Sequence, residues 1–221
     1  MDVTHAIAAR RSVRGYLDRA VDPALLKDIA IKSARAATGG NIQPWHVDIV
    51  HGEAMARLKG IMAGKMERRE SETPGYDIYP KEMTDLYRQR TFAIGEEMYG
   101  RLGIPREDKK ARAIWFARNF QFFGAPAAYF VTVDRRMGPP QWADLGMYLQ
   151  NLMLLAVEHG LATCPQECWA VFPTTVEGFL GTPAERMLFC GVAIGYEDEN
   201  DPANLTRSAR APEEEWLNVM A

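Results

Sequence analysis

The clearest pattern along the chain is a series of short apolar runs separated by longer amphipathic stretches. Four of these runs are bounded by turn-forming residues and predict strands, at about 45–50, 127–133, 161–164 and 187–195. The run APAAYFVTVD is apolar almost without interruption, which is typical of a strand buried on both faces. The stretches between the runs have apolar positions three or four residues apart, which indicates helices.

Capping residues mark the ends of some predicted helices. Asp22 and Pro23 cap and open one of them, and the glycines at positions 39 and 40 follow its end, where positive φ is needed. The stretch SETPGYDIYP contains two prolines and a glycine and predicts a loop. The predicted helices span 3–10, 23–37, 53–69, 81–101, 106–121, 141–160 and 173–180.

This order of elements predicts an α+β fold in which helices surround a small mixed sheet. No linker interrupts the pattern, so we expect a single domain over residues 1–221. The predicted helix at 141–160 is apolar around most of its circumference. Such a helix is buried either in the core or against a second subunit.

Composition narrows the function classes. The chain has 221 residues, of which 47% are apolar, and a net charge of −3, so we expect no nucleic-acid partner. No apolar run approaches the roughly 18 residues of a membrane span, so we expect no membrane partner either. The N-terminal stretch MDVTHAIAARR lacks the order of a secretory signal. These features predict a cytoplasmic protein.

The cysteines and histidines indicate no metal site. The cysteines at 164, 168 and 190 form no CxxC pair, and the four histidines are scattered singly. We therefore expect buried thiols and no metal ligands.

A basic cluster near the N-terminus, ARRSVRGY, is the first candidate for chemistry. Arg10, Arg11 and Arg14 with Ser12 between them suit a phosphate group, because guanidinium groups donate several charge-assisted hydrogen bonds. The alternative is a set of solvated arginines that offset the dipole of a helix end. The chain has no GxxxxGK[ST], no GxGxxG after a strand and no GxSxG elbow. An enzyme without such motifs commonly delegates its reaction to a cofactor.

Five segments resemble the FMN-dependent nitroreductase family, in the family's order and spacing. They are RRSVR, ATGGNIQPW, DLGMYLQNLMLLAVEHGLATCPQE, VAIGY and NLTRSAR. The resemblance covers nearly the whole chain except about 67–115, a segment that varies in the family and is expected to be helical lid material. It is closest to the nitroaromatic and nitrobenzoate-reducing branch. It implies a nitroreductase-like fold and an intertwined homodimer.

The resemblance implies which residues bind FMN. Arg10, Arg11, Ser12 and Arg14 match the run that contacts the phosphate, the ribityl chain and the pyrimidine edge. Arg210 matches the late basic residue that closes on the phosphate. Ser208 stands where a lysine is common, so the phosphate is held more lightly or with help from Arg207.

Two further segments are implied to meet the flavin ring. One approaches from the second subunit and matches Ala37, Thr38, Gly39, Asn41 and Gln43, with Thr38 and Gly39 replacing serines; Asn41 is alternatively a helix C-cap. The other lies along the ring and matches Pro165, Gln166, Glu167 and Cys168. In it, the backbone N–H of Glu167 donates to flavin N5, unless Glu167 is a solvated loop carboxylate. Asn119 falls near a family position at the flavin edge.

The implied reaction takes electrons from NADH or NADPH and passes them through FMN to a nitroaromatic or quinone acceptor in a ping-pong cycle. No catalytic side chain is needed, because the flavin carries the chemistry. Alternatives are a dehalogenase-like or flavin-fragmenting enzyme of the same fold, and a non-catalytic flavin-binding protein. Trp216 and Leu217 are candidate anchors of the tail on the partner. The following aromatic residues are either pocket walls or core: Tyr76, Tyr79, Tyr87, Phe92, Tyr99, Phe120, Phe122 and Phe123.

Overall fold

The computed structural model describes residues 1–220, whose centre is a four-stranded sheet in the order β1-β2-β4-β3. Each neighbouring pair of these strands is antiparallel, so the prediction of a mixed sheet is wrong in this detail. A single parallel bridge, between Ser12 and Thr163, extends the sheet beyond its edge. The strands are β1 (His46–His51), β2 (Ala127–Asp134), β3 (Ala162–Gln166) and β4 (Arg186–Gly195).

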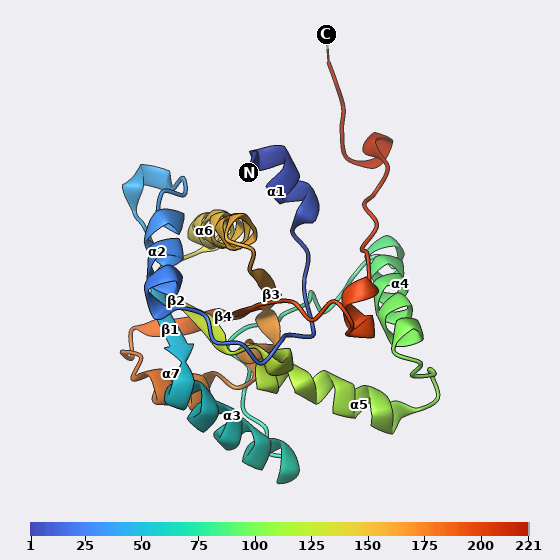
Figure 1. Ribbon diagram of the computed structural model, residues 1–221. Coiled ribbons are helices and arrows are strands. Elements are labelled where there is room, and N and C mark those ends of the chain that lie inside the picture. The colour runs from blue at the N-terminus through green and yellow to red at the C-terminus, as the bar shows by residue number, and fades with distance from the viewer. Residues whose placement is uncertain (221) are drawn as a thin grey trace.

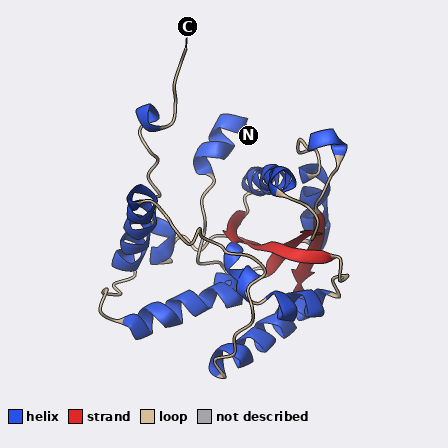
Figure 2. Ribbon diagram, turned by 180° about the vertical axis from the view of Figure 1, so that it is seen from behind, coloured by secondary structure: helices blue, strands red, loops and turns tan. Residues whose placement is uncertain are grey.

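Helices cover both faces of this sheet (Figure 1). Helices α2 and α6 lie together on one face, and α3 and α7 lie on the other, so that the sheet is enclosed between two layers (Figure 2). The helices are α1 (Val3–Ala9), α2 (Pro23–Ser33), α3 (Gly52–Glu67), α4 (Asp85–Arg101), α5 (Lys109–Ala117), α6 (Pro139–Glu158) and α7 (Pro173–Leu180). No helix among these combines the length and apolar character needed to cross a bilayer.

Strand β2 explains why the core has two halves. Its alternate side chains enter different apolar clusters: Phe130 packs with α3 residues such as Leu58, whereas Tyr129 and Val131 pack with α6 residues such as Leu152. The predicted burial on both faces is therefore confirmed. On the first of these faces, Gly191 in β4 is required, because a Cβ there would lie 2.6 Å from the indole of the buried Trp169.

The second helix is shorter than its predicted span of 23–37, because it ends at Ser33. The Ser33 hydroxyl donates to the carbonyl of Ile29, and the carbonyl of Ser33 accepts from the Asn151 amide of α6. After Ser33 the backbone bonds tighten, because the amides of Arg35 and Ala36 donate to carbonyls three residues earlier instead of four. The α-helix therefore ends in a 3₁₀ turn, beside which Asn151 of α6 makes its contact.

The predicted helix at 106–121 is also interrupted. Helix α5 ends at Ala117, and a 3₁₀ segment follows in which Phe122 and Phe123 have φ values of 52° and 54°. Positive φ is rare for aromatic residues, but both rings are fully buried, and the Phe122 ring stacks on Trp169 at 4.6 Å between centroids. Burial of these rings outweighs the local backbone preference. Helix α4 likewise begins later than predicted, at Asp85.

Strand β3 extends past its predicted end at 164, because Pro165 and Gln166 pair with Val192 and Gly191. A proline is tolerated here because β3 is an edge strand. In α6, one side of the helix is buried in this chain, whereas Met147 on the other side is 40% exposed. The helix is therefore only partly buried within the single chain.

Candidate functional site

A cavity of about 900 Å³ lies between the two ends of the chain. Its walls come from the segment after α1, from the segment near residue 208, from α4 and from α6. Figure 1 shows the first two segments converging below α1. The lining includes six of the residues predicted to bind a phosphorylated cofactor: Arg10, Arg11, Ser12, Arg14, Ser208 and Arg210.

Hydrogen bonds to the sheet hold the N-terminal basic segment in place. The Val13 amide donates to the carbonyl of Thr163 at 2.9 Å, and the Leu17 amide donates to that of Tyr196 at 2.9 Å. Between these bonds, Gly15 packs directly against Asp201, and any Cβ at this position would collide with its carboxylate. The chain ends therefore meet because the N-terminal segment bonds to β3 and to Tyr196 after β4, and the C-terminal segment packs on it at Gly15.

The cavity is strongly positive. Five arginines line it, at positions 10, 11, 14, 207 and 210, and no carboxylate does so within residues 1–220. The charge of Arg11 is balanced, because its guanidinium pairs with the carboxylate of Glu197. Arg10 makes no ion pair within the part of the chain that the structure describes. Burial and the neighbouring charge of Arg210 lower the pKa of Arg10. An anion bound here would relieve this repulsion.

The predicted segment with Ala37, Thr38, Gly39, Asn41 and Gln43 does not line this cavity in the same chain. It follows α2 and is held to α6 by Asp144, a 5% exposed carboxylate that accepts from the Thr38 hydroxyl at 2.8 Å. The Gly39 amide donates to the same oxygen at 3.3 Å. Asn41 and Gln43 are exposed and have positive φ. Asn41 is thus not a simple helix C-cap, since the helix ends at Ser33.

The residues predicted to lie along the flavin ring, Pro165 to Cys168, begin in β3, beside the basic segment. The bridge between Ser12 and Thr163 places the basic segment beside this strand, which runs on into Pro165 and Gln166. The buried Gln166 side chain donates to the carbonyl of Asn119 at 2.8 Å, so these two predicted residues are brought together. Glu167 and Cys168 follow in a 3₁₀ segment that the buried Trp169 anchors in the core. Burial raises the pKa of the Cys168 thiol.

Comparison with known proteins identifies the chain. The model of the family described as "Nitroreductase family" matches residues 7–196. The chain belongs to the nitroreductase family. The resemblance inferred from the sequence and the predicted α+β fold class are therefore confirmed.

Individual relatives of this nitroreductase cover nearly its whole length. The 4-nitrobenzoate reductase of Pseudomonas putida is 32% identical and matches 99% of this chain and 96% of its own. The FMN and NADPH-dependent nitroreductase NfnB of Sphingopyxis sp. strain HMH is 45% identical over the full length of both chains, with a TM-score of 0.95. The FMN-dependent nitroreductase NfnB of Mycobacterium smegmatis, solved with NADPH, is 27% identical, with a TM-score of 0.93 and full coverage of both chains.

The cavity of this nitroreductase also has walls that the sequence reasoning missed. Ile94 of α4 and Gln150 of α6 both line it. Gln150 carried a usable signal, because it is a polar residue within an otherwise apolar helical stretch. Ile94 carried none, because α4 has no buried residue within the chain and no clear apolar face.

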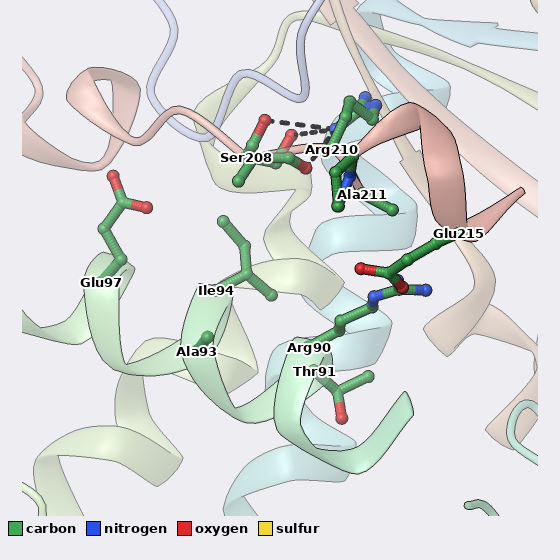
Figure 3. A pocket seen from close by; sticks show the side chains of 11 residues that line it. Arg90, Thr91, Ala93, Ile94, Glu97, Ser208, Arg210, Ala211 and Glu215 are labelled. Atoms are coloured by element: carbon green, nitrogen blue, oxygen red, sulfur yellow. Dashed lines mark hydrogen bonds and ion pairs between the residues drawn. The ribbon is translucent and has the colours of Figure 1, made fainter. Parts of the chain in front are cut away.

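A second cavity of about 510 Å³ adjoins the first and shares Ile94, Ser208 and Arg210 with it. Figure 3 shows α4 on one side and the C-terminal segment on the other, with Arg90 pointing toward Glu215. The Arg210 guanidinium donates to the Ser208 hydroxyl at 2.8 Å. The Arg90–Glu215 pair links the C-terminal segment to α4, whereas the bond between Arg210 and Ser208 lies within that segment.

The aromatic residues with two possible roles separate clearly in this nitroreductase. Phe120, Phe122 and Phe123 are buried and belong to the core. Tyr79, Tyr87 and Phe92 are at least half exposed and remain available as pocket walls. Tyr76 is intermediate, because its ring packs on Trp142 at 5.1 Å between centroids and its hydroxyl donates to the carbonyl of Phe189.

Proposed function

We propose that this nitroreductase binds FMN and transfers electrons from NADH or NADPH to nitroaromatic or quinone acceptors. The observation that carries this proposal is the positive cavity in which Arg10 and Arg210, from opposite ends of the chain, face each other. The relatives support the cofactor and the nitroaromatic class, since their names specify FMN, NADPH and 4-nitrobenzoate.

The cavity fits the phosphate of FMN electrostatically. Among the described residues 1–220, Arg11 is the one of the five arginines whose guanidinium pairs with a carboxylate, so an excess of positive charge remains for a phosphate dianion. Arg10 and Arg210 are proposed to hold the phosphate, with Ser12 and Ser208 as neutral donors, and Arg14 is proposed to support the pyrimidine edge of the ring. Each charge-assisted hydrogen bond of this kind contributes about 1.5–3 kcal/mol.

When bound, FMN supplies the redox chemistry, by accepting electrons from NAD(P)H and releasing them to the acceptor. The residues of the chain bind FMN and orient its ring. Strand β3 leads from the basic segment toward Gln166 and Glu167, which are proposed to lie along the flavin ring. The Glu167 backbone amide is proposed to donate to the ring. Because reductant and acceptor use one site, we expect ping-pong kinetics.

We also propose that two copies form the active unit, each chain acting as a single FMN-binding domain. Asn41 and Gln43 are exposed and far from the cavity of their own chain, which agrees with a role in the partner's site. Trp216 is 69% exposed, and the tail that carries it runs away from the body of the chain (Figure 1). The proposed location is the cytoplasm, where reduced nicotinamide cofactors are available.

The visible spectrum of the purified protein, after incubation with FMN, tests the function. We expect yellow flavin bands that fade anaerobically with NADPH or NADH and return when a nitroarene such as 4-nitrobenzoate is added. Bands that resist both reductants would favour a non-catalytic flavin-binding protein. Bands that fade but do not return with nitroarene or quinone would favour another flavin reaction on this fold. Light scattering tests the dimer, and a monomer with one FMN would contradict it.

A further inference from the structure

Asn204 is buried at the junction of the two chain ends, where its residue is only 3% exposed. It lies in the 3₁₀ segment Pro202–Leu205, between the last strand and the C-terminal arginines. Its side-chain oxygen accepts from the Arg14 amide at 2.7 Å. Its side-chain nitrogen donates to the carbonyls of Gly15 and Asp198, both at 2.9 Å. A buried amide with three such bonds has its position firmly defined.

The backbone of Asn204 extends this junction toward the cavity. Its carbonyl accepts from the Arg207 guanidinium at 2.6 Å, and Arg207 lines the cavity together with Arg210. Asp201 strengthens the same junction, because its side chain accepts from the Ala203 amide at 2.9 Å and packs against Gly15. The side chain of Asn204 thus holds the N-terminal basic segment, and its backbone carbonyl holds Arg207 of the C-terminal one.

The junction at Asn204 connects two segments that carry like charges. Arg10 and Arg210 are like charges that line one cavity, and the charge of Arg210 adds to burial in lowering the pKa of Arg10. The segment that carries Arg210 is exposed from residue 207 to residue 210 and has little packing of its own to oppose that repulsion. Hydrogen bonds at Asn204 oppose it from a buried position.

We propose that Asn204 is a positioning residue that fixes the spacing of the two basic segments and thereby lets the site prefer a phosphorylated flavin over an unphosphorylated one. This inference rests on the proposed function. Asn204 does not line the cavity and acts through the backbone of the N-terminal segment that carries Arg10, and through Arg207 on the segment that carries Arg210. Its loss should therefore weaken only the part of the affinity that comes from the phosphate.

The experiment compares FMN with riboflavin, which has the same ring but no phosphate. Dissociation constants for both are measured by flavin fluorescence with the full-length protein, its Asn204→Ala variant and its Asn204→Ser variant. Asn200→Ala is the matched control, because Asn200 is an exposed asparagine of the same segment. For Asn204→Ala we expect FMN affinity to fall about tenfold or more, since charge-assisted contacts are lost, and riboflavin affinity to stay within about twofold. Asn204→Ser keeps a short polar group, so its FMN affinity should lie between those of the unmodified protein and of Asn204→Ala.

Three results would overturn the inference. Unchanged affinities for both flavins would show that Asn204 does not act on the phosphate site, and an equal loss of affinity for both flavins would show a general structural role. Circular dichroism that finds both variants unfolded would show the same general role. If the unmodified protein itself does not prefer FMN to riboflavin, the proposed function fails instead, and the two failures are distinguishable.

Discussion

Arg10 and Arg210 face the same cavity from opposite ends of the chain, and the charge of Arg210 adds to burial in lowering the pKa of Arg10. Two like charges held together without a partner destabilise the unliganded protein. The same arrangement binds a dianion strongly, because the cost of bringing the charges together is already met in the fold.

Removing either arginine should therefore weaken FMN binding. For Arg10→Ala and Arg210→Ala we expect the dissociation constant to rise about 10- to 150-fold, corresponding to about 1.5–3 kcal/mol. We expect no loss of thermal stability without FMN, because the repulsion is relieved. Isothermal titration and thermal unfolding of the apoprotein measure the two effects. Arg136→Ala is the control, since Arg136 is exposed and pairs with Asp134. Full FMN occupancy in both test variants would refute the phosphate assignment.

Asp144 should determine the order of the segment that we propose reaches the partner's flavin. Asp144→Ala removes the acceptor of both Thr38 and Gly39, so the free energy of unfolding should fall by about 1–3 kcal/mol. Amide hydrogen exchange at Gly39 should become faster. A double-mutant cycle with Thr38→Val isolates the hydroxyl contact. Unchanged exchange at Gly39 would show that other contacts hold this segment.

Glu72 makes part of the stability depend on pH. Burial opposes ionisation of its carboxyl, but hydrogen bonds from Thr175 and Lys65 outweigh burial and lower its pKa below the ordinary value of 4.5. Because the folded-state pKa is the lower one, this stabilisation is complete above about 4.5 and is lost as the pH falls through the folded-state value.

The Glu72→Gln variant isolates this effect. Urea unfolding should show it less stable than the unmodified chain by about 1 kcal/mol at about pH 7, with the difference shrinking toward about pH 3. The control is Glu199→Gln, at an exposed position. A difference that stays constant over this range would mean that the charge of Glu72 is not what stabilises α7.

The thiol of Cys168 should not be needed for turnover. Burial raises its pKa, so it stays protonated near neutral pH, and burial likewise raises the pKa of Cys164 to about 11. We expect Cys168→Ser to keep its FMN and most of its nitroreductase activity. A variant with full FMN content and no activity would reveal a role for the thiol itself.

The tail should stabilise the proposed dimer. Trp216 and Leu217 are 69% and 49% exposed in the single chain, and burying two such side chains on a partner contributes about 1.5–3 kcal/mol each. Sedimentation analysis of a Trp216→Ala, Leu217→Ala double variant should show dissociation at higher protein concentration than for the unmodified chain. Equal dissociation constants would place the tail outside the interface.

Local patterns predicted most of the elements but not all of their ends. Strand β2 was predictable because its continuous apolar run is a property of neighbouring residues. The positive φ of Phe122 was not, because it depends on stacking against Trp169, which lies far along the chain. The end of α2 at Ser33 was missed because no glycine or proline marks the 3₁₀ turn that closes the helix there.

By itself the sequence determined the fold class, the family resemblance and the two basic runs, since these are carried by residue types and spacing within short segments. The resemblance already implied that Arg10 and Arg210 meet at one phosphate. Only the tertiary structure showed the cavity that they line together, that Asp144 holds Thr38, and that Asn204 joins Arg14 to the C-terminal segment. The physical reason is the separation of the contacting residues along the sequence. Periodicity reports burial over a few residues, whereas these contacts join residues more than 100 positions apart and form only when both partners are packed on the same sheet.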